Sequence, residues 1–283
     1  MLIGAFIAQA DLLRKAHPGC GVAKIYDTLK PNWIGRVNGV KLLYSYGFKL
    51  QKRVNYKRTT FSVSSPYHNL IEGMLVTNKN QVWQSDITFI WVGERFYYLV
   101  FIIDIYTKQI VGYSVSDNMR TACNLKALHQ AFRSQKGKDL SGLVHHSDKG
   151  SQYADHRYRK QLEDRGIWIS MGMMAQANAY AERLNGIIKN EFLNKWSIKN
   201  FVQLKQRVKK AVDHYNNKRI HRHLPRKLTP NQFEAQLLYL DTQNRPKVIV
   251  YAEGNPKIRT ASSRSNFNPE TEPQDHVCPM VIN

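Results

Sequence analysis

The alternation of apolar and polar side chains divides the middle of the chain into short strands followed by helices. The first strands are joined by segments short enough for antiparallel hairpins, Gly93-Glu94 and Thr107-Lys108. After them the pattern changes to helices that alternate with single strands. The expected strands are 81–91, 95–104, 108–116, 142–147 and 167–170, and the expected helices are 121–133, 155–165 and 179–193. This order predicts an α/β fold, with a mixed sheet flanked by helices.

The first 48 residues show a helical pattern. Apolar residues at 22, 25, 26 and 29 form one helix face, and after a break at Pro31 a second helical run continues until Gly47 can end it. Two short helices around a turn predict a helix-turn-helix-like domain over residues 1–48. On its second helix, Arg36, Asn38 and Lys41 could contact DNA. A small three-helix domain that reads no bases is the alternative.

The chain that follows the middle region is again helical and basic. Residues 201–215 form an amphipathic pattern, and a cationic turn with Lys218, Arg219 and Arg222 comes directly after it. We expect a basic helical extension at 196–240 and a basic linker at 49–80. The remainder, 241–283, is rich in Asn, Pro and Ser, which predicts a largely disordered tail.

Charge marks the same divisions of the chain. The 283 residues carry a formal net charge of +21, with +9 in residues 1–80, +4 in 81–195 and +9 in 196–230. Two basic segments therefore flank a nearly balanced core. Either segment alone could be a solvated basic face, but both together favour binding to the phosphate backbone of nucleic acid.

Three carboxylates stand where an α/β sheet enzyme would place a metal ligand. Asp86 interrupts an apolar strand, which is costly unless a cation or a partner compensates it. Asp148 directly follows the strand at 142–147, and Glu182 lies on the predicted helix that begins at 179. Hard oxygen ligands suit Mg²⁺ or Mn²⁺, and divalent ions can clamp the oxygens of a phosphodiester during cleavage.

The chain resembles the second-frame (OrfB) transposases of bacterial insertion sequences of the IS-three group, which have a retroviral-integrase-like DDE core. The matching stretches include Asn80-Gln-Val-Trp-Gln-Ser-Asp-Ile-Thr88, His145-His-Ser-Asp-Lys-Gly-Ser-Gln-Tyr153, Ala179-Tyr-Ala-Glu-Arg-Leu-Asn-Gly-Ile-Ile-Lys-Asn-Glu191 and His214-Tyr-Asn-Asn-Lys-Arg-Ile-His221. The resemblance implies a ribonuclease-H-like integrase core at 81–195. It also implies that Asp86, Asp148 and Glu182 are the catalytic and metal-binding triad, and that Lys189 contacts DNA.

The same resemblance implies a reaction and its partners. The protein would bind element-end DNA and then cut it and join it to target DNA, using two Mg²⁺ or Mn²⁺ ions. It would act as a homo-oligomer on DNA, with an upstream-frame (OrfA) protein as a partner or as part of a frameshift fusion. One departure is the spacing of 33 residues between Asp148 and Glu182, about two fewer than in the family. Glu191, on another helix face, is interpreted as a solvated surface charge.

Two other functions fit parts of the sequence. A catalytically inactive DNA-binding remnant would keep the basic segments but would have no reason to keep the acids. A ribonuclease-H-like nuclease would show a fourth carboxylate, for which Asp104 is the one plausible candidate among the strands.

Composition also bears on the compartment. Three distant cysteines, Cys20, Cys123 and Cys278, argue against a zinc finger and fit a reducing compartment. We interpret His145, His146, His221 and His223 as packing or phosphate contacts. The apolar run at 96–103 is too short to span a bilayer, so we expect a cytoplasmic, nucleoid-associated protein without a membrane segment.

Overall fold

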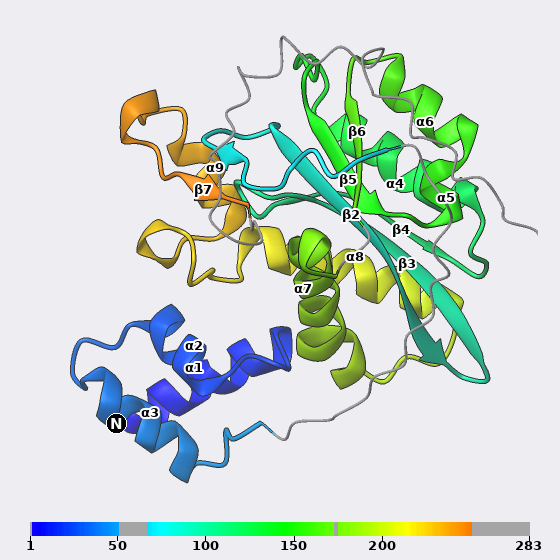
Figure 1. Cartoon of the computed structure of the whole chain (residues 1–283). Helices are drawn as coiled ribbons and strands as arrows, with labels where there is room; N and C mark the ends of the chain where they lie inside the picture. Colours follow the sequence, from blue (N-terminus) through cyan, green and yellow to red (C-terminus); the bar gives the residue numbers. More distant parts are fainter. Residues whose placement is uncertain (1, 51–66, 173–174, 251–283) are drawn as a thin grey trace, which may run out of the picture.

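The N-terminal helices form a small packed unit beside a larger α/β core (Figure 1). The structure, a computed structural model, describes residues 2–50, 67–172 and 175–250. In this unit α1 (Leu2–Ala16), α2 (Val22–Leu29) and α3 (Arg36–Ser45) enclose a cluster of buried apolar side chains. The predicted pair of helices around a turn is therefore present. The cluster contains Phe6, Ala10, Cys20, Val22, Ile25, Leu43 and Phe48.

The core is built on a five-stranded mixed sheet with the order β4-β3-β2-β5-β6. β2 pairs antiparallel with β3, β3 pairs antiparallel with β4, and β5 runs parallel to both β2 and β6. This is the ribonuclease-H-like arrangement, in agreement with the predicted fold class. The strands are β2 (Val82–Val92), β3 (Arg95–Asp104), β4 (Ile110–Ser116), β5 (Val144–Asp148) and β6 (Trp168–Gly172).

The two hairpin turns lie where the sequence predicts them. The turn between β2 and β3 contains Gly93 with a φ of +62°, a left-handed conformation that glycine adopts without a steric penalty. The turn between β3 and β4 places Lys108 at the same φ of +62°, which is uncommon for a residue with a side chain. The first turn is therefore explained locally, whereas the second needs support from tertiary contacts.

Helices cover both faces of the sheet. On one face lie α4 (Thr121–Ser134), α5 (Ser151–Ala154) and α6 (His156–Glu163), which share a hydrophobic cluster with Trp83, Val100 and Ile102. On the other face lie α7 (Ala179–Ile187) and α8 (Phe201–Asn217), packed against Leu99, Phe101 and Ile103. Because α8 buries apolar side chains in the same cluster as the strands, it packs as part of the core.

The helix expected at 179–193 is not continuous. After α7 the chain forms a π-helical turn at Ile188–Phe192 (η2) and a 3₁₀ turn at Leu193–Lys195 (η3). Such π turns interrupt α-helices and are frequent at functional sites. Two further 3₁₀ segments are η1 (Ala175–Asn178), which precedes α7, and η4 (Pro225–Lys227), which follows α8.

The C-terminal part of the described chain adds a helix, a 3₁₀ segment and a short strand to the core. α9 (Pro230–Gln236) begins with a capping box in which Thr229 and Gln232 satisfy each other's backbone N–H groups. Beyond it come η5 (Thr242–Asn244) and β7 (Val248–Ile249), which pairs with β1 (Leu75–Val76). At the end of the described chain Val250 is buried in one cluster with Ile71 and Met74. Residues 251–283 of the predicted tail and 51–66 of the predicted basic linker lie outside the described residues.

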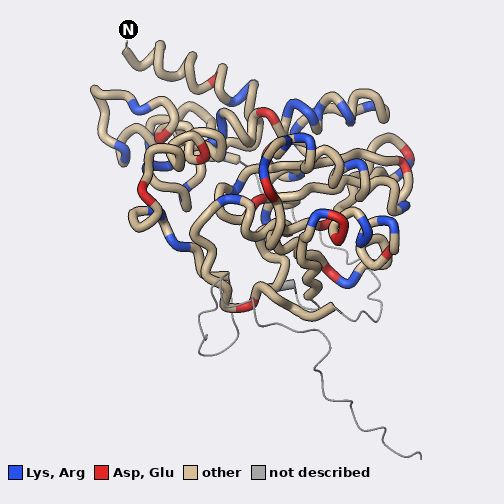
Figure 2. The backbone as a smooth tube through the Cα atoms, turned by 90° about the horizontal axis from the view of Figure 1, so that it is seen from above, with Lys and Arg blue, Asp and Glu red and all other residues tan. Residues whose placement is uncertain are grey.

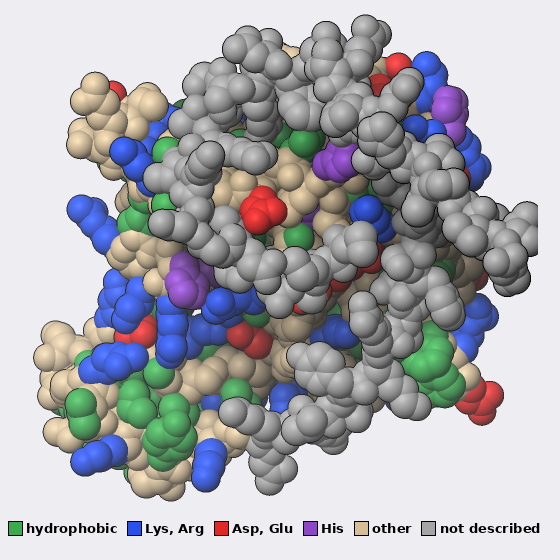
Figure 3. Space-filling model, viewed as in Figure 1, with side chains coloured by type: hydrophobic (Ala, Val, Ile, Leu, Met, Phe, Trp, Pro, Cys, Tyr) green, Lys and Arg blue, Asp and Glu red, His purple; other side chains and the backbone are tan. Residues whose placement is uncertain are grey.

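Charged positions are distributed over the whole described chain (Figure 2), with 42 Lys and Arg against 21 Asp and Glu in the sequence. On the face seen in Figure 3, Lys and Arg side chains gather where the N-terminal helices meet the core. None of the helices in the described parts of the chain is both long and apolar enough to cross a membrane.

Candidate active site

The first acid of the site is placed by the central strand of the sheet. Side chains alternate along β2, so Asp86 points to the same face as Gln84 and Ile90, toward α7. Its Oδ1 accepts a hydrogen bond from the backbone N–H of Ile87 at 2.9 Å, and its Oδ2 accepts one from Asn185 Nδ2 at 2.8 Å. Asp86 is therefore held by neutral donors, without an ion pair among the described residues.

The second acid ends the neighbouring parallel strand. The register pairs Gln84 with His146, so Asp86 and Asp148 each lie two residues further along adjacent strands, at the same end of the sheet. Asp148 Oδ1 accepts a hydrogen bond from Gly150 N at 3.1 Å. A Cβ atom at residue 150 would lie 2.9 Å from that oxygen, so glycine permits the backbone to turn close around the carboxylate.

The third acid, Glu182, is exposed in the first turn of α7, where the positive end of the helix dipole favours a carboxylate. Gln84 Oε1 accepts from the N–H groups of Tyr180 and Ala181 at 3.1 and 3.3 Å, so the side chain two residues before Asp86 caps this helix. In addition, Asn178 Nδ2 donates to the carbonyl of Ser85 at 3.0 Å. The strand that carries one acid thus fixes the helix that carries another.

These amide side chains are the residues that the sequence analysis missed. Gln84 precedes Asp86 by one strand period, and Asn185 follows Glu182 by about one helical turn. Each spacing places the amide beside an acid. This spacing is the signal in the sequence from which Gln84 and Asn185 could have been identified. Gln84 and Asn185 are buried, at 0% and 5% exposure.

The pKa values of all three acids are raised, mainly by burial. Burial raises the pKa of Asp86 to about 7, and the charges of Asp148 and Glu182 add to that effect. Burial also raises the pKa values of Asp148 and Glu182, and the charge of Asp148 adds to the increase at Glu182. The structure therefore brings the three predicted residues within electrostatic range of one another, at a point where negative charge is poorly compensated.

Such a group of carboxylates suits a hard divalent cation. Within the described ranges, no group of three or more Asp, Glu, His or Cys side chains is arranged to hold a metal ion. Mg²⁺ is commonly held by only one or two carboxylates, with water and substrate phosphates as its other ligands. The oxygen-only donor set and the mutual repulsion of the acids fit this mode of binding. The Oδ1 atom of Asn185 is also buried without a hydrogen-bond partner among the described residues.

Lys189 lies close to this group, although a π turn and not an α-helix carries it. Burial lowers the pKa of Lys189, and the charge of Asp86 offsets part of that decrease. Its ammonium lies 5.5 Å from the centre of the Phe89 ring. The predicted basic residue is thus near the acids.

The residues predicted to bind DNA fall into two groups. Arg36, Asn38 and Lys41 are exposed on α3, and Arg36 Nε also contacts Asp27 Oδ1 at 3.1 Å. Lys218 and Arg222 are exposed after α8.

Arg219, which the sequence analysis placed with the DNA contacts, is 7% exposed and donates two hydrogen bonds of 2.8 Å to Glu191. We therefore correct that interpretation, because its guanidinium is already occupied inside the protein.

Glu191 is likewise not a solvated surface charge. Besides Arg219, it contacts His17 Nε2 at 2.6 Å and Lys24 Nζ at 3.0 and 3.1 Å. Hydrogen bonds and charges from these groups hold the pKa of Glu191 far below its ordinary value, although burial alone would raise it. The π turn shifts position 191 away from the face that a regular helix would give it. Glu191 thus joins the N-terminal helices to the core.

The buried histidines contact other protein groups. His145 Nε2 lies 3.0 Å from Tyr158 Oη, His146 Nδ1 lies 2.8 Å from Ser170 Oγ, and His221 Nε2 lies 3.0 Å from Tyr215 Oη. His223 is exposed.

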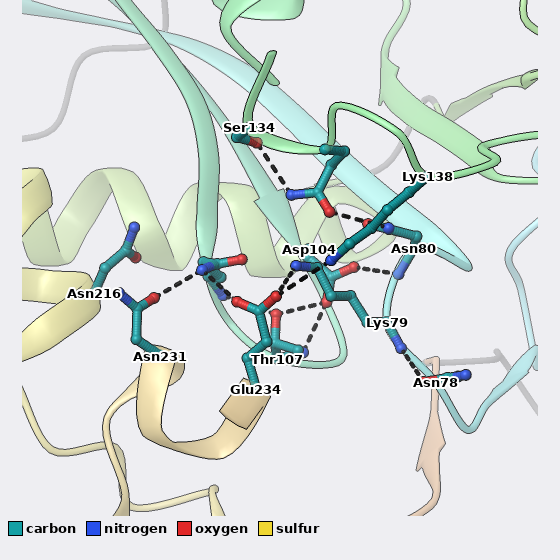
Figure 4. A network of polar contacts seen from close by, with 12 residues as sticks. Asn78, Lys79, Asn80, Asp104, Thr107, Ser134, Lys138, Asn216, Asn231 and Glu234 are labelled. Atoms are coloured by element: carbon teal, nitrogen blue, oxygen red, sulfur yellow. Dashed lines mark hydrogen bonds and ion pairs between the residues drawn. The ribbon is translucent and has the colours of Figure 1, made fainter. Parts of the chain in front are cut away.

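Asp104, the candidate fourth acid, closes the turn between β3 and β4 (Figure 4). Its Oδ1 accepts from the N–H and the hydroxyl of Thr107 at 2.8 Å, and its Oδ2 accepts from Asn80 N at 2.8 Å. Nearby, Glu234 of α9 contacts Lys79 and Gln109. Asp104 is therefore a structural residue of this network, which joins α9 to the sheet.

Comparison with known proteins agrees with this geometry. Residues 76–176 and 168–230 match models of the integrase core domain. The chain is 33% identical over 210 residues to the transposase for insertion sequence element IS629 of Shigella sonnei, covering 72% of this chain and 70% of that protein. It is 29% identical over 239 residues to a putative transposase for IS986/IS6110 of Mycobacterium tuberculosis, covering 80% of this chain and 84% of the relative.

A solved structure, the HTLV-2 integrase catalytic core domain in complex with magnesium, aligns with a TM-score of 0.46 at 23% identity, covering 59% of this chain and 99% of that one. The strand order of the sheet, and not this alignment, carries the assignment of the fold. Together, the ribonuclease-H-like sheet, the matched integrase core domain and the identity to the Shigella sonnei protein show that the chain belongs to the insertion-sequence transposases.

Proposed function

We propose that this transposase binds the ends of its element through its basic surfaces and uses Asp86, Asp148 and Glu182 as a DDE triad for DNA cleavage and strand transfer. The observation that carries the proposal is the convergence of these acids at one end of the sheet, where the charges of Asp148 and Glu182 help to raise the pKa of Asp86. Asp86 accepts a side-chain hydrogen bond from the neutral amide of Asn185 and forms no ion pair among the described residues. A divalent cation bound there would relieve the repulsion.

In the proposed reaction a water oxygen forms a bond to phosphorus while the bond to the 3′ oxygen breaks. The released 3′ hydroxyl then attacks a phosphodiester of target DNA, so that its oxygen forms a bond to phosphorus while the bond to the target strand's own 3′ oxygen breaks. Two Mg²⁺ or Mn²⁺ ions, when bound by the triad, would stabilise charge on the attacking and leaving oxygens. Gln84 and Asn178 keep α7 against β2, so that Glu182 stays beside the two aspartates. Lys189 would contact a phosphate of the bound strand.

We propose further that the protein acts as a homo-oligomer on DNA. Each chain supplies one triad, whereas an element has two ends that must be cut and joined. Arg36, Asn38 and Lys41 on α3 and Lys218 and Arg222 after α8 are exposed and would hold the phosphate backbone. An upstream-frame partner stays an expectation from the sequence.

Substitution of Asp148 by Asn tests the proposal. The change is nearly isosteric but removes a charge from the site, so cleavage and strand transfer on element-end DNA with Mg²⁺ should fall by at least a hundredfold. Binding to the same DNA in EDTA should stay within a few-fold of the parent, because losing an acid removes repulsion toward phosphates.

Asp139→Asn is the matched control, since Asp139 is exposed and its side chain contacts Ser141. It should leave both activities unchanged. Full strand transfer by Asp148→Asn would show that the triad is wrongly assigned, and the DNA-binding remnant would then be the better account.

A further inference from the structure

A second site lies beside α7, separate from the three acids. It is a cavity of about 550 Å³ between α7, the turn after β3, the end of α8, α9 and residues 246–250. Pockets of this size accommodate small organic ligands. Gln84 lines it, but Asp86, Asp148 and Glu182 do not. The cavity is therefore distinct from the proposed active site.

The wall of the cavity is cationic and aromatic. Lys108, Arg183 and Lys247 contribute positive charge, and none of the residues that line it is Asp or Glu. Tyr180 contributes a half-buried aromatic ring, and Tyr215 and Phe233 contribute buried rings to the wall. Three cations around one cavity without an acid repel one another, so an anion bound among them would be stabilised.

Lys108 is an unusual residue in this wall. It is 7% exposed, and its ammonium lies 4.0 Å from the centre of the Tyr180 ring and donates to the carbonyl of Ile105. No carboxylate pairs with it among the described residues. Burial lowers its pKa to about 8. Its left-handed backbone, with a φ of +62°, adds a conformational cost.

A second buried group also lacks a partner. The Tyr106 side chain lines the cavity at 1% exposure, and its hydroxyl has no hydrogen-bond partner within the described structure. A buried hydroxyl without a partner is rare, because its desolvation is not compensated. Tyr106 and Lys108 are two residues apart and line the same cavity. Tyr106 contributes a hydroxyl without a hydrogen-bond partner, and Lys108 contributes an ammonium without an ion pair among the described residues.

We propose that this cavity binds one nucleoside phosphate, with the phosphate at Lys108 and Arg183 and the base among the aromatic rings. The hydroxyl of Tyr106 donates to the ligand. Aromatic rings stack on any base, and the buried Lys108 and the exposed Arg183 would hold phosphate oxygens with charge-assisted hydrogen bonds. The ligand is either one nucleotide unit of a DNA strand or a free nucleotide. The proposal does not depend on catalysis at the three acids.

Isothermal titration of the full chain in EDTA measures this binding directly. The probes are deoxyadenosine 5′-monophosphate, thymidine 5′-monophosphate, inorganic phosphate and deoxyadenosine. Both nucleotides should bind more tightly than phosphate or the nucleoside, because each of the latter fills only half of the site. Asp148→Asn should bind them as the parent does, which separates this site from the proposed active site.

Two variants identify the site. Lys108→Asn removes the charge at a left-handed position that Asn tolerates, and it should weaken nucleotide binding about tenfold. Tyr106→Phe removes only the hydroxyl and should weaken it several-fold without lowering the melting temperature, because an uncompensated polar atom is lost. Lys136→Asn, in the exposed segment after α4, is the charge-matched control and should bind as the parent does.

Competition with a single-stranded oligonucleotide distinguishes the two sources. Displacement of the bound mononucleotide, together with weaker oligonucleotide binding by Lys108→Asn, would identify the ligand as a unit of the DNA strand. No displacement would identify it as a free nucleotide. If neither mononucleotide binds, or if Lys108→Asn and Tyr106→Phe bind them as tightly as the parent, the proposed site does not exist.

Discussion

At the scale of single residues, the acids of the candidate site depend on neutral amide side chains. Gln84 is fully buried and bridges β2 to the N-terminus of α7, accepting from Tyr180 and Ala181 and donating to the carbonyl of Ala177 at 3.0 Å. It is a positioning residue, because it acts on the proposed reaction through the placement of Glu182. An amide is suited to this role, since it donates and accepts without adding a charge beside three carboxylates.

We predict that Gln84→Leu lowers the rate constant of cleavage by tenfold or more while leaving the affinity for element-end DNA unchanged. Loss of the cap frees the first turn of α7 and displaces Glu182 from the aspartates. Single-turnover cleavage and a gel-shift assay measure the two quantities. Gln84→Glu keeps an acceptor at the helix terminus and should recover part of the rate. If Gln84 had a purely structural role, both variants would have a lower melting temperature, and Gln84→Glu would cleave no faster than Gln84→Leu.

At the scale of elements, the N-terminal helices dock on the π turn of the core through Glu191. His17 and Lys24 come from the helical unit, and Arg219 comes from the segment after α8. The ring of His17 also stacks on Phe192, with centroids 4.4 Å apart. The carboxylate of Glu191 therefore compensates basic side chains from two parts of the chain. Its removal would leave these buried basic groups without an ionic partner.

We predict that Glu191→Gln destabilises the protein at pH 7 by about 3 kcal/mol, the usual cost of breaking a buried ion pair. The folded state lowers the pKa of Glu191 from its ordinary value of 4.5. Its contribution is therefore complete above about pH 4.5 and is lost as the pH falls through the folded pKa. The difference in melting temperature between parent and variant should thus be smaller at pH 4 than at pH 7.

Thermal unfolding followed by circular dichroism at the two pH values checks this expectation. Glu94→Gln, in the exposed turn between β2 and β3, is the matched control and should change neither value. A difference that stays constant between pH 7 and pH 4 would contradict an ionised Glu191 at the interface.

At the scale of the whole molecule, the excess of positive charge implies binding to DNA that depends on salt. We predict that the double variant Arg36→Gln, Lys41→Gln weakens DNA binding. If both residues contact phosphates, the slope of log affinity against log salt should become less steep by about 2. Fluorescence anisotropy with labelled element-end DNA from 50 to 200 mM salt, a range that resolves such slopes, measures this.

The control is Arg133→Gln, Lys136→Gln, which removes the same charges from an exposed region near the end of α4. α4 covers the face of the sheet away from the N-terminal helices (Figure 1). An equal loss of slope in both double variants would indicate nonspecific attraction by net charge and no DNA contact by α3.

The sequence by itself determined the features that depend on local pattern. Strands and helices follow periods of two and 3.6 residues, and Gly93 and the Thr229-Pro230 pair set a turn and a helix start through their own backbone preferences. Asp86 and Asp148 stood out because they interrupt or end apolar strands, whereas Glu182 was assigned through the resemblance to the transposases. Strand order then follows from short hairpins and crossover connections.

Only the tertiary structure decided which charged side chains are buried and which of them form ion pairs inside the protein. Glu191 and His17 are 174 residues apart in the chain, and nothing in their neighbourhoods indicates that they meet. The same holds for Arg219, which composition grouped with the DNA contacts, and for Lys108, whose burial depends on α7 and α9. Local periodicity reports which face a residue occupies, whereas its ionic partner and its exposure depend on elements brought together from distant parts of the chain.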